Sequence, residues 1–149
     1  MGLLKEVLKD IKPIGKDNGI DLFLKKLGKL IRDGSIKAEV FAGGSIAKET
    51  FLKDDHDVDI FVKFDLRYKG KDLSKILGKV LKPLHPKLVH GSRDYFSIEN
   101  RLSFEIIPVL NITKSGQAEN IMDMSPLHVY WVFGNSFQLY WYVFLYMEM

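Results

Sequence analysis

Apolar positions recur along the chain with two spacings, one typical of helices and one typical of strands. Stripes with apolar residues three or four apart predict three helices. The first helix covers residues 3–11 and ends before Pro13. The second begins with Asp17 or Asn18 as its cap and ends at Gly34, and the third covers residues 72–81.

Runs rich in β-branched and aromatic residues alternate with turn residues and predict strands. Glu99-Asn100-Arg101 has the composition of a hairpin tip between the last two of them. Farther on, Ser125 and Pro126 indicate a helix start, with Ser125 as its cap. The predicted strands are residues 37–42, 57–64, 87–90, 95–98 and 102–110, and a short helix is expected around residues 46–51.

The stretch from residue 40 to residue 62 carries the strongest chemical signal. Its first apolar run ends in Gly43-Gly44-Ser45, whose free backbone N–H groups and hydroxyl could hold a phosphate. Its second run opens with Asp57 and Asp59, which share one face of a strand. Adjacent carboxylates repel each other, and a divalent cation with oxygen ligands, magnesium or manganese, relieves that repulsion.

Each half of this pattern alone has an ordinary structural explanation. A Gly-Gly-Ser sequence is usually only a turn, and an Asp-x-Asp sequence is usually a solvated strand edge. Their order and spacing, with a predicted strand before each, indicate metal-assisted nucleotidyl transfer. Glu105 stands alone within an apolar strand, so it lies either on a solvent face or beside the aspartates as a third metal ligand.

Composition sets the broad class. The chain has 149 residues, 46% hydrophobic and 28% charged, which is ordinary for a globular domain with a real core. It has no cysteine, which excludes disulfides, thiolate metal sites and cysteine nucleophiles and suits a reducing cytoplasm. The net charge of +3 allows a polyanionic partner without requiring one.

Basic and aromatic residues are unevenly distributed. Residues 69–93 hold seven Lys or Arg and one acid, which is either a surface facing nucleic acid or triphosphate or a solvated helix face. Residues 127–149 hold nine of the chain's eighteen aromatics and no Lys or Arg. The unbroken apolar run, residues 139–147, is too short to cross a membrane. We expect residues 131–149 to pack on the core or to be covered by a partner.

Several of these motifs together resemble the signature of the polymerase-β-like nucleotidyltransferases, and most closely the head domain of class I, archaeal-type CCA-adding enzymes. The resemblance covers about residues 5–130. It rests on Gly44-Ser45-Ile-Ala-Lys48-x-Thr followed by Asp57-Val-Asp59, on Phe-Glu105-Ile-Ile-Pro, on Asp123-Met-Ser125-Pro-Leu-His128, and on the opening Lys9-Asp-Ile-Lys-Pro. The family's third acid is usually Asp, and Glu105 is one methylene longer.

The resemblance implies an α/β (α+β) fold with a mixed sheet of about five strands backed by helices, with residues 1–130 as the head domain. It implies attack of a tRNA 3′-hydroxyl on the α-phosphate of CTP or ATP, with two Mg²⁺ ions or Mn²⁺. Asp57, Asp59 and Glu105 would be the catalytic metal ligands. The nucleotide would be held by Gly44, Ser45, Lys48, Ser125 and His128.

The family continues for hundreds of residues beyond this segment. We therefore expect the chain to be a minimal version, one subunit of a split enzyme or a truncated head. The expected protein partner is a second subunit or another copy of the chain, bound through the aromatic tail. Two alternatives stay open from the sequence. One is a minimal nucleotidyltransferase antitoxin that modifies a partner protein, and the other is a non-catalytic assembly module.

Overall fold

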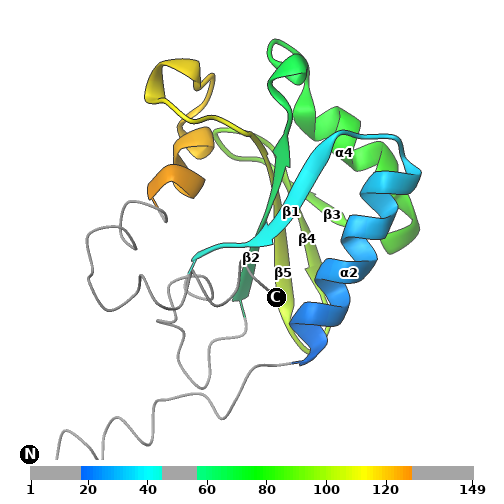
Figure 1. Cartoon of the computed structure of the whole chain (residues 1–149). Coiled ribbons are helices and arrows are strands. Elements are labelled where there is room, and N and C mark those ends of the chain that lie inside the picture. Colours follow the sequence, from blue (N-terminus) through cyan, green and yellow to red (C-terminus); the bar gives the residue numbers. More distant parts are fainter. Residues whose placement is uncertain (1–17, 45–56, 129–149) are drawn as a thin grey trace, which may run out of the picture.

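The computed structural model describes residues 18–44 and 57–128, which form a mixed five-stranded sheet with helices on one face (Figure 1). The strand order across the sheet is β1-β2-β5-β4-β3. Only β2 and β5 run parallel, while the other neighbouring pairs are antiparallel. The predicted α+β class with a mixed sheet of about five strands is therefore confirmed.

The strands fall close to the predicted ranges. They are β1 (Ala38–Ala42), β2 (Asp57–Phe64), β3 (Lys87–Val89), β4 (Tyr95–Glu99) and β5 (Ser103–Leu110). The tip that joins β4 to β5 lies at residues 100–102, where the Asn100 N–H donates to the Leu102 carbonyl oxygen at 2.9 Å. The predicted hairpin is thus confirmed.

Two α-helices, α2 (Asn18–Asp33) and α4 (Leu73–Leu81), lie together on one face of the sheet (Figure 1). Helix α4 begins where the Asp72 carboxylate accepts the Lys75 N–H at 2.9 Å, which is a normal N-cap. It ends before Pro83, as expected of a residue without an N–H. Helix α2 ends at Asp33, before Gly34, as predicted.

The main core lies between these helices and the sheet. Alternate residues of β2 and β5 point toward the helices, so Ile60 and Ile106 are fully buried against Leu27 and Leu77. The rings of Phe23 and Phe104 stack with their centroids 4.0 Å apart and fix α2 to the sheet. The residues between them along β2 and β5 therefore point to the opposite face.

The segment after β5 crosses the face of the sheet opposite α2 and α4. It contains two short 3₁₀ turns, Ser115–Gln117 and Ile121–Asp123, where the sequence predicted only a loop. Two more 3₁₀ turns, Leu66–Tyr68 and Lys82–Leu84, flank α4.

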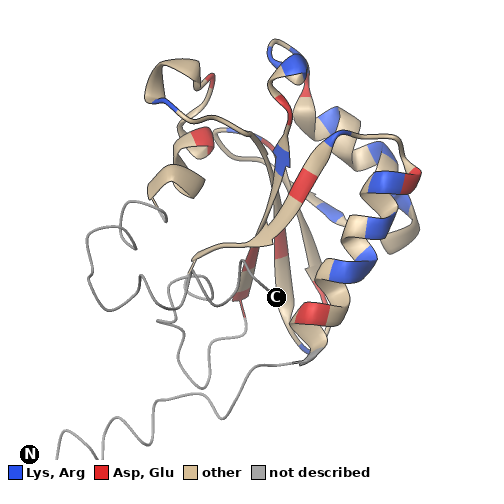
Figure 2. Ribbon diagram, in the orientation of Figure 1, with Lys and Arg blue, Asp and Glu red and all other residues tan. Residues whose placement is uncertain are grey.

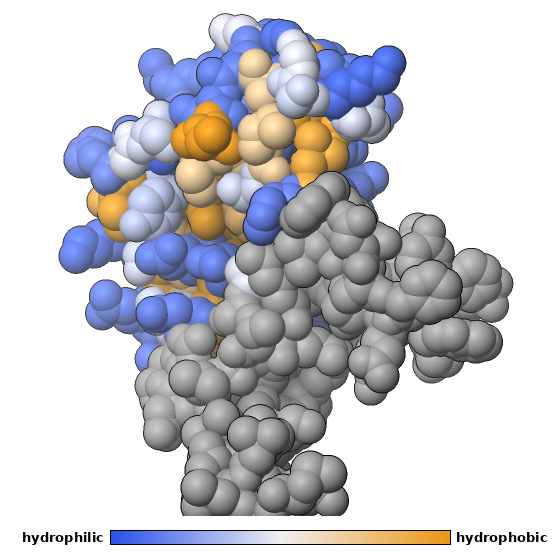
Figure 3. Space-filling model, turned by 90° about the vertical axis from the view of Figure 1, so that its left-hand side faces the viewer, coloured by the Kyte–Doolittle hydropathy of each residue, from blue (hydrophilic) through white to orange (hydrophobic). Residues whose placement is uncertain are grey.

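Figure 3 views the molecule from the side on which the segment after β5 lies, and it shows apolar residues gathered in a patch bordered by hydrophilic ones. Among the helices in the described ranges, none is both long and apolar enough to cross a membrane.

Candidate active site

The site begins with two acidic residues on the sheet face that the helices leave open. Asp59 in β2 and Glu105 in β5 are direct neighbours in the parallel register, and Asp57 precedes them by one strand repeat beside Ser103. Parallel neighbours in register project side chains on the same face. All three acidic side chains therefore lie on one face, at the end of the sheet where β2 and β5 begin. The parallel pairing of β2 with β5, two strands far apart in the sequence, therefore brings the three acidic residues together.

The backbone at Gly43 and Gly44 packs directly on this face. The Gly43 N–H donates to the Asp59 carbonyl oxygen at 2.8 Å, and this continues the β1–β2 pairing by one residue. Gly44 has a left-handed φ of 57°, and a Cβ there would collide with the Asp59 carboxylate. A Cβ on Gly43 would collide with the Phe61 ring. Both positions therefore require glycine, and the turn brings backbone to within contact of a catalytic candidate.

The electrostatics of Glu105 reflect its crowded position. Burial raises the pKa of Glu105, and the negative charges of Asp59 and Asp57 raise it further. A hydrogen bond from the Tyr95 hydroxyl acts in the opposite direction and stabilises the Glu105 carboxylate. Burial and the charges of Glu105 and Asp59 raise the pKa of Tyr95, so its hydroxyl stays protonated and donates to Glu105.

An apolar cluster adjoins the acidic residues on the same face. Phe61, Ile107 and Val109 follow Asp59 and Glu105 along their strands and are buried. Phe41, Tyr95 and Met122 pack against them, and the rings of Phe41 and Phe61 lie 5.5 Å apart. The cluster gives the acidic residues one dry side, which strengthens the interactions of any charge placed there.

The donor set suits a hard divalent cation. Its candidate ligands are all carboxylate oxygens, the ligand type that magnesium and manganese prefer. In the described part of the chain, no three acidic or histidine side chains are gathered closely enough to form a ready-made metal site. Asp57, Asp59 and Glu105 nevertheless share one face of the sheet, and the charges of Asp59 and Asp57 add to the effect of burial in raising the pKa of Glu105. A bound cation would stabilise that concentration of negative charge.

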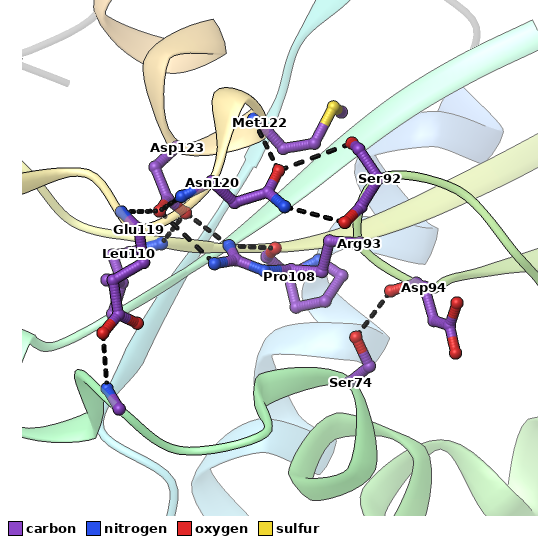
Figure 4. A network of polar contacts seen from close by, with 11 residues as sticks. Ser74, Ser92, Arg93, Asp94, Pro108, Leu110, Glu119, Asn120, Met122 and Asp123 are labelled. Atoms are coloured by element: carbon purple, nitrogen blue, oxygen red, sulfur yellow. Dashed lines mark hydrogen bonds and ion pairs between the residues drawn. The ribbon is translucent and has the colours of Figure 1, made fainter.

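A buried ion pair fixes the segment that follows β5 (Figure 4). Asp123 is fully buried and accepts hydrogen bonds from the Arg93 guanidinium and from the Leu110 N–H at 2.8 Å. It also accepts the N–H groups of Glu119 and Asn120, both at 3.0 Å. Burial alone would raise the pKa of Asp123, but these donors and the positive charge of Arg93 outweigh it and lower the pKa.

Comparison with known proteins agrees with this geometry. The nucleotidyltransferase domain family matches residues 20–124, which is more than half of the chain. The chain belongs to this family. The matched range includes the Gly43-Gly44 turn, all three acidic residues and the Arg93–Asp123 pair.

Relatives of the nucleotidyltransferase domain include archaeal CCA-adding enzymes. The enzyme from Nanoarchaeum equitans is 41% identical over 97 residues, which cover 63% of this chain and 24% of that protein. The enzyme from Methanocaldococcus jannaschii is 34% identical over 140 residues, covering 85% of this chain and 31% of that protein. The matched part of the chain thus spans about a quarter to a third of the length of these relatives.

Solved structures show the same fold. A cytoplasmic RNA terminal U-transferase superposes with a TM-score of 0.58 at 22% identity, covering 72% of this chain and 33% of that one. Escherichia coli MS115-1 CdnC, in its complex with HORMA-deltaN, superposes with a TM-score of 0.57 at 20% identity, covering 85% of this chain and 47% of that one. At these identities the likeness concerns the fold alone.

The structure places the predicted nucleotide-binding residues of this nucleotidyltransferase domain in two regions. Gly44 lies against Asp59, while Ser45 and Lys48 lie outside the described residues, as do the helix expected around residues 46–51 and the predicted first helix and aromatic tail. Ser125 and His128 are on a helical segment, residues 124–128, that directly follows Asp123. The prediction that Ser125 caps this helix is wrong, because helical structure already begins one residue earlier.

Sequence reasoning missed two contributors to the site. The sequence pattern placed Tyr95 only in a strand, but its hydroxyl donates a hydrogen bond to Glu105. The pattern placed Arg93 in a basic surface, but its side chain is only 12% exposed and is paired with Asp123. Arg93 and Asp123 are thirty residues apart, so no local sequence pattern indicates that they pair.

Proposed function

We propose that this chain is the catalytic part of a metal-dependent nucleotidyltransferase of the CCA-adding type. Its reaction would transfer CMP or AMP from CTP or ATP to the 3′ end of tRNA, with release of pyrophosphate. The observation that carries the proposal is the pairing of Asp59 with Glu105 in parallel register beneath a glycine turn. The similarity to archaeal CCA-adding enzymes supports the choice of tRNA as acceptor.

In this proposal the carboxylates of Asp57, Asp59 and Glu105 would hold a pair of Mg²⁺ ions, with Mn²⁺ as a substitute. When bound there, the cations would lower the pKa of the attacking hydroxyl and neutralise charge on the triphosphate. The glycine at position 44 is part of this fit, because any Cβ would occupy the space beside the Asp59 carboxylate. The hydrogen bond from the Tyr95 hydroxyl favours the ionised form of Glu105 and opposes the rise in pKa caused by burial and the neighbouring charges.

Nucleotide binding is divided between two segments in this proposal. The turn at Gly44 leads into Ser45 and Lys48, which would bind the β- and γ-phosphates by hydrogen bonding and charge. The segment anchored by Asp123 would bring Ser125 and His128 toward the triphosphate or ribose. Asp123 itself is buried, so its part is to position this segment.

The test is a transfer assay on the purified 149-residue chain with Mg²⁺, α-labelled CTP or ATP, and tRNA lacking its 3′-terminal CCA. We expect label on the tRNA, and none with the Asp57→Ala variant. Label on a co-purified protein instead of tRNA would support the antitoxin alternative. Transfer that survives Asp57→Ala would contradict the proposed site. Metal-dependent triphosphate binding without transfer would indicate that another subunit binds the acceptor tRNA.

A further inference from the structure

The outer surfaces of α2 and α4 carry two matching rows of cations. On α2 the row is Lys25, Lys29 and Arg32, and on α4 and the turn after it the row is Lys75, Lys79 and Lys82. Both rows have the spacing i, i+4, i+7, which places their members on one side of a helix. Lys26 lies beside the first row, and all seven side chains are exposed. Figure 2 shows the basic residues gathered on these two helices.

These cations are not neutralised within the described residues. The ion pairs there join Lys37 and Arg67 to Asp65, Lys63 to Glu39, His90 to Asp94 and Arg93 to Asp123, so none involves the two rows. The acids on the same two helices and their caps are Asp21, Asp33 and Asp72, and Asp72 is engaged in capping α4. Like charges at i, i+4 repel each other on a helix, and this repulsion opposes the favourable position of Arg32 and Lys79 in the last turns of their helices.

The two rows approach each other where the end of α2 packs against α4, and together they are called the α2–α4 track. Gly34, at the end of α2, touches α4 so closely that a Cβ on it would lie 2.7 Å from a Val80 methyl group. Arg32 and Lys79 are therefore near the crossing of the two helices. At 1.5 Å per residue, the α2 row alone extends for about 10 Å.

The other end of the track lies at the β4–β5 hairpin tip, where β5 begins. Lys26 lines a cavity of about 300 Å³ together with Asn100 and Arg101 at the β4–β5 hairpin tip. The next strand residue after that tip, Ser103, is the register partner of Asp57. The track thus leads along α2 to the end of the sheet at which the acidic side chains lie on the opposite face.

We propose that the α2–α4 track binds the phosphate backbone of the RNA acceptor and delivers its 3′ end to the carboxylates around the hairpin tip. This inference rests on the proposed function for the identity of the acceptor. An RNA backbone fits the track because it is a regular line of negative charges, whereas the opposite face presents Asp57, Asp59 and Glu105 and would repel it. The charge separation between the two faces therefore orients the bound RNA.

The test compares two double variants of the 149-residue chain with the wild type. Lys29→Gln with Lys79→Gln removes one charge from each row, and Lys69→Gln with Lys114→Gln removes two exposed lysines away from the track. Gln is a good helix former, which suits Lys29 and Lys79 in their helices, and Lys69 and Lys114 are exposed, so both variants are expected to fold like the wild type. Binding of an acceptor-stem RNA hairpin with an unpaired 3′ end is measured by fluorescence anisotropy at salt concentrations from about 50 to about 200 mM. Affinity that comes from phosphate contacts falls steeply over this range.

We expect the track variant to bind this RNA about tenfold more weakly or worse, with a log–log salt slope reduced by about 1.5, and the control variant to match the wild type. Mg²⁺-dependent CTP binding should be the same in all three proteins. An equal loss of RNA affinity in both variants, or no loss in either, would contradict the proposal that the track binds RNA. RNA binding that depends on the track, without nucleotide transfer by the wild type, would contradict the proposed function and still support RNA binding by the track.

Discussion

Asp59 and Glu105 stand side by side on the two parallel strands of an otherwise antiparallel sheet, forty-six positions apart in the sequence. Their proximity is costly in the absence of a cation, because burial and the neighbouring charges raise the pKa of Glu105. The proposed metal-dependent transfer rests on this pair of repelling carboxylates, one of which lies beneath a glycine turn.

The first prediction concerns the glycine that touches Asp59. In Gly44→Ala the new Cβ would meet the Asp59 carboxylate, and the left-handed φ would add a cost of about 1–2 kcal/mol. We expect lower thermal stability and loss of nucleotide transfer. The matched control is Gly70→Ala, which has a φ of 77° but no atom within 4 Å of the new Cβ. It should show the stability loss alone, and equal activity losses in both variants would contradict the role of Gly44.

The second prediction concerns Tyr95, which acts through Glu105. Tyr95→Phe removes the hydroxyl that donates to the Glu105 carboxylate and keeps the ring in the apolar cluster. Losing such an outer partner typically weakens a metal site by about 10–100-fold. We expect the Mg²⁺ concentration for half-maximal transfer to rise by about tenfold, with activity recovering at high Mg²⁺.

A control for this experiment is Tyr68→Phe. The Tyr68 hydroxyl accepts the Lys37 N–H at 3.2 Å, away from the acidic residues. Its loss should leave the Mg²⁺ dependence unchanged. If Tyr95→Phe changed stability but left the Mg²⁺ dependence of transfer at the wild-type value, its role would be purely structural.

The third prediction concerns the buried Arg93–Asp123 pair and its response to pH. Asp123→Asn leaves the Arg93 guanidinium largely buried without its counter-charge, which should cost about 3–5 kcal/mol near pH 7. The folded pKa of Asp123 is lowered, so the stability it contributes is present above the ordinary carboxyl pKa of 3.8 and is lost as pH falls toward the folded value. The stability gap between wild type and variant should therefore narrow below about pH 4.

Chemical denaturation at a series of pH values measures this gap. The matched control is Asp94→Asn, whose partner His90 has an 80% exposed side chain. An exposed pair contributes at most about 1 kcal/mol, so this variant should stay near the wild type. A gap for Asp123→Asn that was constant from neutral to acidic pH would show that the loss comes from packing and not from charge.

Local patterns predicted much of the fold. The bounds of β2 agree with prediction, and α4 begins one residue after the predicted start at Asp72, because alternation and helical spacing depend on residues close in sequence. The register of Asp59 with Glu105 does not follow from either strand alone, since only the parallel pairing creates it. The resemblance to a known family was needed to place Glu105 with the aspartates.

The errors have the same origin. Ser125 was assigned as a cap from its neighbour Pro126, but the chain already turns at Asn120, whose side chain accepts the Met122 N–H at 2.9 Å. The long-range bonds of Asp123 then determine where the following helix begins. Arg93 looked like a solvent-facing cation for the same reason, because its partner lies thirty residues away.

The most direct measurement is Mn²⁺ binding to the chain in the presence of CTP, followed by electron paramagnetic resonance. It compares the wild type with Asp59→Asn and with Glu39→Gln, an acid on the same sheet face that is paired with Lys63. We predict that Asp59→Asn weakens Mn²⁺ binding by about tenfold or more and that Glu39→Gln leaves it unchanged. Equal Mn²⁺ affinity in all three proteins would contradict a metal site built on Asp59 and Glu105.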